Sequence, residues 1–595
     1  MRMFNFTKSL FLASLFVVFT FVLTGCFGPA KAELSKNEKS NDGVALENYL
    51  PEDTLMMISL STQDDDQRAS FQNLMSYFPQ EDMKTLWESM MKDLTLELEG
   101  SGMTYEEDIA PIFGDSYRFT FGLAGEMSDE DPDMYIALTL ADKEKATAFI
   151  EKMLEEDNGE DLKKGNIFGA MTVDNEDEDM YLALYKDTIL ITNVLENREA
   201  ALKRVSKNES SLLSSEIFKE SYDKLPTPNL GIAFINLKEL FAKLSETQEE
   251  GMPSGEFLDA LYGEALAFTA EEDGIRMTVQ VAFNEESKEF NLKDYPYAEP
   301  YMYKNIPGDK LIMYTEAYGM KDAFDMQLAA LGEDEASKDG VEQFKAILKA
   351  ALNLDLEDDI LSWMDKGFVM VVQHNKGIIP AISFYIDAQT NPDSAQKVLD
   401  LIDAGMEQAV ASMLVNAPEE LDTTKIIIKD TVMLGDSEID RVVFDVSNLS
   451  DEELLTAGLP SGIFVEPVEI YYGMTDEKYF LFSTYTGLDK DYGTTVTVAK
   501  NEKIKESQNY LKGYEYQLTY ISVEEIMNYV DTFVGFMELI EGPMGDEVKT
   551  GLEKVKSYVA PIKYLVAGDK KVENVAEGTM FVKIEKPVEK SSEYL

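Results

Sequence analysis

The chain has 595 residues, of which 45% are hydrophobic and 11% aromatic, a composition typical of globular proteins that excludes a wholly disordered chain. Asp and Glu number 112 against 53 Lys and Arg, and the formal net charge of -59 excludes electrostatic binding to nucleic acids. A single His and a single Cys exclude disulfide frameworks, most zinc sites and thiol catalysis.

The N-terminal residues 1–25 have the pattern of a bacterial lipoprotein signal peptide. Arg2 and Lys8 precede an apolar run at residues 10–23 that is too short to span a bilayer comfortably. The run ends in Leu-Thr-Gly-Cys at residues 23–26, which resembles the bacterial lipobox. This resemblance implies cleavage before Cys26 and a diacylglycerol on its sulfur. The alternative is a free, buried Cys26 behind an N-terminal membrane helix.

Residues 26–49 are predicted to form the lipidated Cys and a flexible tether, because Lys, Asn, Ser, Glu and Asp dominate and apolar periodicity is almost absent. No later stretch reaches about 18 apolar residues, the length that a spanning helix requires. We therefore expect a membrane-anchored lipoprotein of the cell envelope, facing the periplasm or the cell exterior. Its acidic surface is interpreted as a means of solubility rather than as a ligand site.

The body of the chain has the pattern of a tandem duplication. Residues 50–55 (Leu-Pro-Glu-Asp-Thr-Leu) are echoed by residues 306–311 (Ile-Pro-Gly-Asp-Lys-Leu), and each segment leads into a β-prone run. Residues 216–244 align without a gap with residues 502–530, and most apolar positions are apolar in both. The alternative is convergent helix–strand–helix patterning, but matched blocks in the same order favour duplication.

We predict a first α+β repeat at residues 50–290 and a second at residues 300–588, with a connector at residues 284–303. Period-two and period-3.6 patterns predict the elements of each repeat. Strands are expected at residues 56–60, 117–123, 135–140, 180–185, 188–194, 230–235, 266–270, 276–283, 312–315, 368–373, 381–386, 564–567 and 579–584. Helices are expected at residues 146–154, 196–205, 214–224, 238–244 and 395–402, with Asp142 and Asp387 as N-caps of the first and last. Strands adjacent in sequence dominate, which favours a largely antiparallel sheet with helices packed on one face.

Four short motifs resemble one known family. They are Leu-Pro-x-Asp-Thr at residues 50–54, Glu-Asp-Ile…Gly at residues 107–114, Asp-Lys-Glu-Lys-Ala at residues 142–146, and Ile-Phe-Lys-Glu before Leu-Pro at residues 217–226. The chain resembles the bacterial envelope family catalogued as domain of unknown function 3352. The resemblance implies an envelope location and an α+β fold, and it supplies no catalytic residues. The second repeat departs from the pattern, since Leu225-Pro226 becomes Leu511-Lys512.

Three strings match the order of a penicillin-binding-type serine hydrolase: Ser-x-x-Lys from Ser221, Ser-x-Asn from Ser507, and Lys-Thr-Gly from Lys549. Ser221 and Ser507 occupy equivalent places in two repeats, whereas such an enzyme needs three different elements to converge. Lys549 lies in a helix-like stretch instead of on a strand. We interpret the strings as chance matches, and we predict no catalytic residues.

Acidic clusters at residues 64–66, 129–133 and 174–179 are interpreted as solvated tips, although divalent-cation binding by one of them is left open. Asp489-x-Asp491-x-Gly493 resembles the start of a calcium loop but lacks the required Gly and Glu. His374 is expected in a solvent-facing turn, without a partner for base catalysis. No cofactor is predicted, because the chain has neither a Walker loop nor a dinucleotide fingerprint.

These observations predict a non-enzymatic interaction or structural module with a possible protein partner in the envelope. The sequence defines neither the ligand nor the oligomeric state. The alternative is a carrier or substrate-binding lipoprotein with an apolar cleft for peptide or lipid, suggested by the 30 Met, 29 Tyr and 32 Phe. An acidic-site hydrolase is the third possibility, which a buried carboxylate pair in a cleft would favour.

Overall fold

The structure is a computed structural model of the chain. It describes residues 45–79, 110–114, 116–125, 132–156, 162–175, 179–246, 260–284, 304–319, 321, 335–375, 378–416, 426–447, 449–450, 467–475, 477–493, 496–511, 513–514, 517–572 and 574–587. The predicted signal peptide, Cys26, the tether up to residue 44, the motif at residues 107–109 and the connector from residue 285 to 303 lie outside the described residues.

The described strands fall into two halves of ten. The first half contains β1 (Met56–Ser61), β2 (Arg118–Ala124), β3 (Asp133–Thr139), β4 (Leu162–Ile167), β5 (Ala170–Asn175), β6 (Met180–Tyr185), β7 (Thr188–Thr192), β8 (Gly231–Ile235), β9 (Leu261–Glu271) and β10 (Gly274–Phe283). The second half contains β11 (Leu311–Tyr318), β12 (Gly367–Gln373), β13 (Ala381–Asp387), β14 (Ile427–Leu434), β15 (Ser437–Phe444), β16 (Val468–Met474), β17 (Tyr479–Ser483), β18 (Gln517–Ser522), β19 (Ile562–Val572) and β20 (Val575–Ile584).

Helices connect the strands in both halves. Those of the first half are η1 (Leu46–Tyr49), α2 (Asp65–Met75), α4 (Ala110–Phe113), α5 (Lys143–Glu156), α6 (Leu195–Lys207), η3 (Leu212–Ser214), α7 (Glu216–Tyr222) and α8 (Leu237–Glu246). Those of the second half are α11 (Glu335–Leu352), η6 (Leu356–Ile360), η7 (Leu361–Trp363), α12 (Pro392–Asn416), α14 (Leu488–Asp491), η9 (Val498–Lys500), α15 (Glu502–Leu511), α16 (Val523–Glu541) and α17 (Asp546–Val559). None of these helices is long and apolar enough to cross a membrane.

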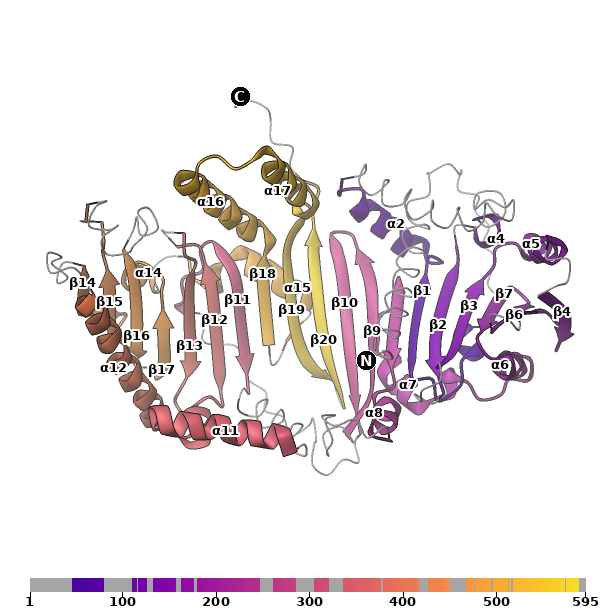
Figure 1. Cartoon of the computed structure of the whole chain (residues 1–595), viewed down its shortest axis with the longest axis horizontal. Helices are drawn as coiled ribbons and strands as arrows, with labels where there is room; N and C mark the ends of the chain where they lie inside the picture. Colours follow the sequence, from indigo (N-terminus) through magenta and orange to yellow (C-terminus); the bar gives the residue numbers. More distant parts are fainter. Residues whose placement is uncertain are drawn as a thin grey trace.

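All twenty described strands form one antiparallel sheet (Figure 1). Strand pairing gives the order β4-β5-β6-β7-β3-β2-β1-β8-β9-β10 in the first half. The second half has the corresponding order β14-β15-β16-β17-β13-β12-β11-β18-β19-β20. Each strand therefore has a counterpart at the same place in the other half.

The two halves join where their last strands, β10 and β20, pair with each other. Both strands follow a two-residue hairpin turn, so Gly274 corresponds to Val575 and Thr278 corresponds to Thr579. Thr278 and Thr579 are also partners across the junction. A pseudo-two-fold axis consequently passes through this pair, as in an isologous interface between two copies of one chain.

Helices cover both faces of the sheet instead of the one face expected from the sequence. In β7 the adjacent residues Ile189 and Leu190 are both buried, and their side chains point to opposite faces. Ile189 packs in a cluster with Ile150 of α5, whereas Leu190 packs in a cluster with Leu202 of α6. The α+β class is confirmed, and the sheet forms the middle layer.

The end of the tether and the start of one helix, α12, differ from the sequence prediction. Residues 46–49 were assigned to the tether, but they form the short helix η1. Leu46, Tyr49 and Leu50 are fully buried in the core, so this segment docks on the sheet through its apolar side chains. Asp142 caps α5 as predicted, since its Oδ1 accepts from the N–H of Lys145 at 3.0 Å. Asp387, in contrast, ends β13. Asn391 caps α12 instead, which Pro392 at the first helical position explains.

Candidate functional site

The hydrolase-like strings begin on three different helices, α7, α15 and α17, where their first residues make local contacts. Ser221 and Ser507 are fully buried in α7 and α15, and their hydroxyls donate to carbonyls of their own helices, Ile217 O at 3.0 Å and Ile504 O at 2.8 Å. Lys549 lies on α17, where its ammonium pairs with Glu538 at 2.8 Å. Both serines therefore make local helix contacts, and the interpretation of the strings as chance matches stays a prediction.

His374 is partly buried instead of lying in a solvent-facing turn. Its side chain is 16% exposed, and Nε2 lies 2.9 Å from the carbonyl oxygen and 3.2 Å from the carboxylate of Glu525. The ring also packs edge-on against Tyr529 with a centroid separation of 5.9 Å. The sequence expectation was wrong because α16, which carries Glu525 151 residues further along the chain, folds back over the end of β12.

Several acidic residues in these segments have structural partners, whereas residues 129–131 and 176–178 of the predicted clusters lie outside the described residues. Asp64 caps α2 by accepting from the N–H of Gln67 at 2.8 Å. In the calcium-like segment, Asp489 and Asp491 accept hydrogen bonds from the hydroxyls of Tyr471 at 3.1 Å and Tyr485 at 2.9 Å. Among the residues that the structure describes, no three His, Cys, Asp or Glu side chains are grouped as metal ligands would be.

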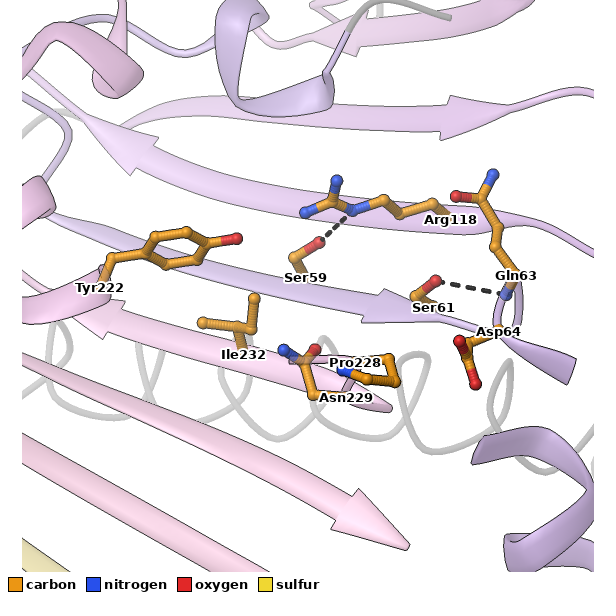
Figure 2. A pocket seen from close by; sticks show the side chains of 9 residues that line it. All are labelled: Ser59, Ser61, Gln63, Asp64, Arg118, Tyr222, Pro228, Asn229 and Ile232. Atoms are coloured by element: carbon orange, nitrogen blue, oxygen red, sulfur yellow. Dashed lines mark hydrogen bonds between the residues drawn. The ribbon is translucent and has the colours of Figure 1, made fainter. Parts of the chain in front are cut away.

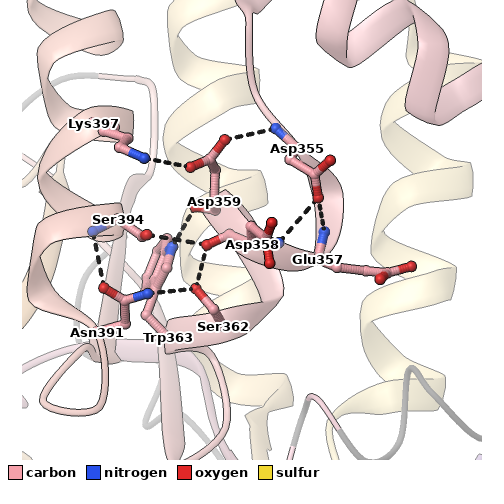
Figure 3. Close-up of polar contacts among 9 residues, drawn as sticks. All are labelled: Asp355, Glu357, Asp358, Asp359, Ser362, Trp363, Asn391, Ser394 and Lys397. Carbon is pink, nitrogen blue, oxygen red and sulfur yellow. Dashed lines mark hydrogen bonds and ion pairs between the residues drawn. The ribbon is translucent and has the colours of Figure 1, made fainter.

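The Asp358-Asp359 pair of the second half belongs to a network that ties η6 to α12 (Figure 3). Lys397 of α12 donates to the carboxylate of Asp359 at 2.7 Å, and the indole N–H of Trp363 donates to the Asp359 carbonyl at 2.8 Å. The hydroxyl of Ser394 donates to the Asp358 carbonyl at 3.0 Å. This motif therefore has a structural explanation: it docks a helix against the buried Trp363.

The candidate functional site is a cavity of about 350 Å³ in the first half, next to β1 (Figure 2). Its walls come from β1, β2 and β8, from the segment after β1, and from α7 and the loop that follows it. The lining residues are Ser59, Ser61, Gln63, Asp64, Arg118, Tyr222, Pro228, Asn229 and Ile232. Most of these side chains are polar, so the site differs from the apolar cleft of the alternative prediction.

Arg118 is the central cation of the pocket, and its charge is already balanced. Nη2 forms an ion pair with the carboxylate of Glu47 from η1, which is only 2% exposed. Nε donates to the hydroxyl of Ser59 at 3.1 Å. Burial, together with the negative charge of Glu47, raises the pKa of Tyr222 above its usual value, so its phenol stays protonated at neutral pH. The pocket thus presents a neutral phenol beside a compensated guanidinium.

The corresponding place in the second half is occupied by side chains. Equivalent positions follow from the strand register and from the gapless alignment of residues 216–244 with residues 502–530. Ser59 corresponds to Glu316, Ser61 to Tyr318, Arg118 to Gly367 and Pro228 to Tyr514. Glu316 is completely buried and Tyr318 is 4% exposed. The two halves therefore share a topology but differ in chemistry at this position.

Three phenols hold the buried carboxylate of Glu316. Tyr314 and Tyr318 donate to Oε2 at 2.8 and 3.1 Å, and Tyr514 donates to Oε1. Burial raises the pKa of Glu316, and the three hydrogen bonds oppose this shift. A fully satisfied polar cluster in the core stabilises a unique packing arrangement.

Among the pocket residues, sequence analysis singled out only Asp64, as part of the acidic cluster at residues 64–66. The pocket residues lie in four separate segments of the chain, and no short motif joins them. The sequence did contain one signal: the duplicated block shows Pro228 opposite Tyr514, a replacement of a small side chain by a large one within otherwise matched positions. Such a difference between repeats marks a place where one copy has an open volume.

The chain is therefore an α+β protein with one sheet through two topologically equivalent halves and a polar pocket in the first. It belongs to the family described as "Protein of unknown function (DUF3352)", whose model matches residues 11–553. The resemblance drawn from the sequence motifs is thus confirmed for nearly the whole chain. The lipoprotein signal peptide remains a prediction.

No curated protein is similar enough to match the chain. Similar solved structures are crystal forms III, IV and I of TP0453, with sequence identities of 10%, 8% and 12%. They cover 42%, 40% and 42% of this chain and 84%, 81% and 83% of that chain, with TM-scores of 0.24, 0.22 and 0.22. At TM-scores this low, the likeness carries no argument about fold or function.

Proposed function

We propose that the protein is a lipid-anchored bacterial envelope protein that acts as a non-enzymatic interaction or structural module. The observation that carries this proposal is the continuity of the sheet through β10 and β20, which joins both halves into one extended body. Such a body offers a large surface to partners. The buried hydroxyls of Ser221 and Ser507 support a non-enzymatic role, because both are inaccessible to solvent and donate to carbonyls of their own helices.

The alternative function, a carrier with an apolar cleft, has less support. A cavity lined mainly by apolar side chains, under α5 and between β4, β5 and β6, has a volume of about 30 Å³. That volume suits about one water molecule, whereas ligand pockets measure about 300–1,000 Å³. The larger cavity next to β1 has the size of a ligand pocket but a polar lining.

The membrane anchor is tested by the substitution Cys26→Ser. We expect the variant to leave the membrane fraction or to accumulate as the uncut precursor, because it lacks the sulfur that acylation requires. Retention in the membrane fraction at the mature mass would refute the anchor.

The interaction role is tested by affinity capture from cross-linked intact cells, with the Cys26→Ser variant as the control. A partner recovered near stoichiometrically, and only with the anchored form, is the expected result. Absence of any enriched partner would count against an interaction module and leave the structural role.

A further inference from the structure

We propose that the pocket next to β1 binds a neutral, hydroxyl-rich ligand, namely a single saccharide ring. This inference concerns the residues in Figure 2 and does not depend on the membrane anchor. It rests on the hydrogen-bonding capacity that remains in the pocket, on its charge, and on the contrast with the second half.

The pocket retains several polar groups that a ligand can engage. Among the described residues, the side-chain amide of Gln63 has no hydrogen-bond partner, and only its backbone N–H is used, by Ser61 Oγ at 3.2 Å. The amide nitrogen of Asn229 donates to Pro226 O at 3.0 Å, which leaves its Oδ1 as an acceptor. Asp64 caps α2 through Oδ1 and keeps Oδ2. Amides and carboxylates of this kind supply the donors and acceptors that sugar hydroxyls need.

The charge of the pocket disfavours an anion. The guanidinium of Arg118 is paired with Glu47, so the remaining formal charge belongs to Asp64. Its carboxylate lies at the N-terminus of α2, where the helix dipole and the Gln67 N–H already stabilise it. The carboxylate of Asp64 would repel an incoming anion, whereas a cation would have to compete with the helix N-terminus and the Gln67 N–H for the same carboxylate. A neutral ligand encounters neither cost.

The shape of the site also suits a sugar ring. A volume of about 350 Å³ lies at the lower end of the range for small-molecule pockets, about 300–1,000 Å³. The side chains of Pro228 and Ile232 supply apolar surface on one side of the cavity, across β1 from Arg118 and Gln63, and the ring of Tyr222 lies at one end with its hydroxyl toward Arg118 (Figure 2). A pyranose has the same division between C–H faces and hydroxyl edges.

The second half indicates that the fold does not impose this cavity. At the same place, Tyr318 and Tyr514 stand in the positions of Ser61 and Pro228, and their hydroxyls bind the buried Glu316. Small side chains in the first half therefore keep open a volume that the same topology fills in its other copy.

The test is ligand-detected saturation-transfer NMR and calorimetry on the purified protein with four probes that share one ring. The probes are glucose and N-acetylglucosamine, which are neutral, glucuronate, which is anionic, and glucosamine, which is cationic. We expect both neutral sugars to bind and glucuronate to bind at least about tenfold more weakly, the factor that about 1.4 kcal/mol produces.

Two variants place the binding in the pocket. Ser61→Tyr introduces the side chain that the second half carries there and should abolish binding. Gln63→Ala removes one hydrogen-bonding group and should weaken binding about three- to tenfold. Gln396→Ala is the matched control, because Gln396 is an exposed amide on α12 in the other half.

The proposal fails if neither neutral sugar binds to the folded wild-type protein. It also fails if only glucosamine binds, which would indicate a site for amines. Neutral-sugar binding that is unchanged in both Ser61→Tyr and Gln63→Ala, with circular dichroism spectra like that of the wild type, would place the sugar elsewhere. These experiments use purified protein, so their failure is distinguishable from failure of the Cys26→Ser test in cells.

Discussion

The ion pair between Arg118 and Glu47 gives the sharpest test of how the pocket is built. Glu47 lies on η1 and is 2% exposed, whereas the side chain of Arg118 is 22% exposed. The substitution Arg118→Met removes the cation but leaves the apolar stem. It leaves a carboxylate buried without its partner, and Ser59 loses the Nε donor.

The magnitude follows from this asymmetry. Removing one member of a buried ion pair costs about 3–5 kcal/mol, mainly because the other charge stays buried and uncompensated. Arg118 keeps some contact with solvent, so we expect a loss of about 3 kcal/mol in the free energy of unfolding. The double variant Glu47→Gln/Arg118→Met removes both charges. Its stability should return to within about 1 kcal/mol of the wild type, since no ion is then left buried.

The assay is equilibrium unfolding in urea, followed by far-ultraviolet circular dichroism. Lys164→Met is the control, because Lys164 and Glu151 form a pair at 2.9 Å in which both side chains are about half exposed. That variant should lose less than about 1 kcal/mol.

Two results would refute the reasoning about Arg118. One is a loss in Arg118→Met no larger than that of the control. The other is a double variant no more stable than Arg118→Met, which would mean that the buried charge of Glu47 does not cause the loss.

Three further predictions concern the second half. Gly308→Ala should lower the free energy of unfolding by about 1–3 kcal/mol, because a Cβ would lie 2.4 Å from the backbone nitrogen of Val498. Gly551→Ala should raise the free energy of unfolding by about 0.5–1 kcal/mol, because Gly551 lies inside α17 with open space around it. If the urea midpoints of the two glycine variants moved in the same direction, this account would be contradicted. The hydrogen bond from Lys397 lowers the pKa of Asp359 in the folded protein. The ionised carboxylate therefore stabilises the fold above about pH 4, the pKa of an unfolded Asp, and this stability is lost as the pH falls through the lower folded pKa. Asp359→Asn should therefore flatten the fall in melting temperature below about pH 4, and an unchanged acid profile would show that the Lys397 contact is without effect.

Local features of the fold followed from local sequence signals. The hairpin at β6 and β7 was predicted from period-two alternation on both sides of Lys186-Asp187, and the stretch that contains Lys549-Thr550-Gly551 was interpreted as helix-like. The Asp142 cap was predicted for the same reason, since an N-cap bonds to a backbone group three residues away. The Asp387 cap was wrong because a carboxylate before a helix is only a candidate, and Pro392 fixed the start of α12 further along.

The sequence by itself determined the α+β class, the family and the matching blocks of the two halves, because these depend on periodicity and on residues close together in the chain. Only the tertiary structure decided the β10–β20 junction, the helices on both faces and the pocket. Thr278 meets Thr579 across 301 positions, and Glu47 meets Arg118 across 71. Neither contact leaves a periodic trace, because a strand pair or a buried charge is stabilised by its partner in space and not by its neighbours in sequence.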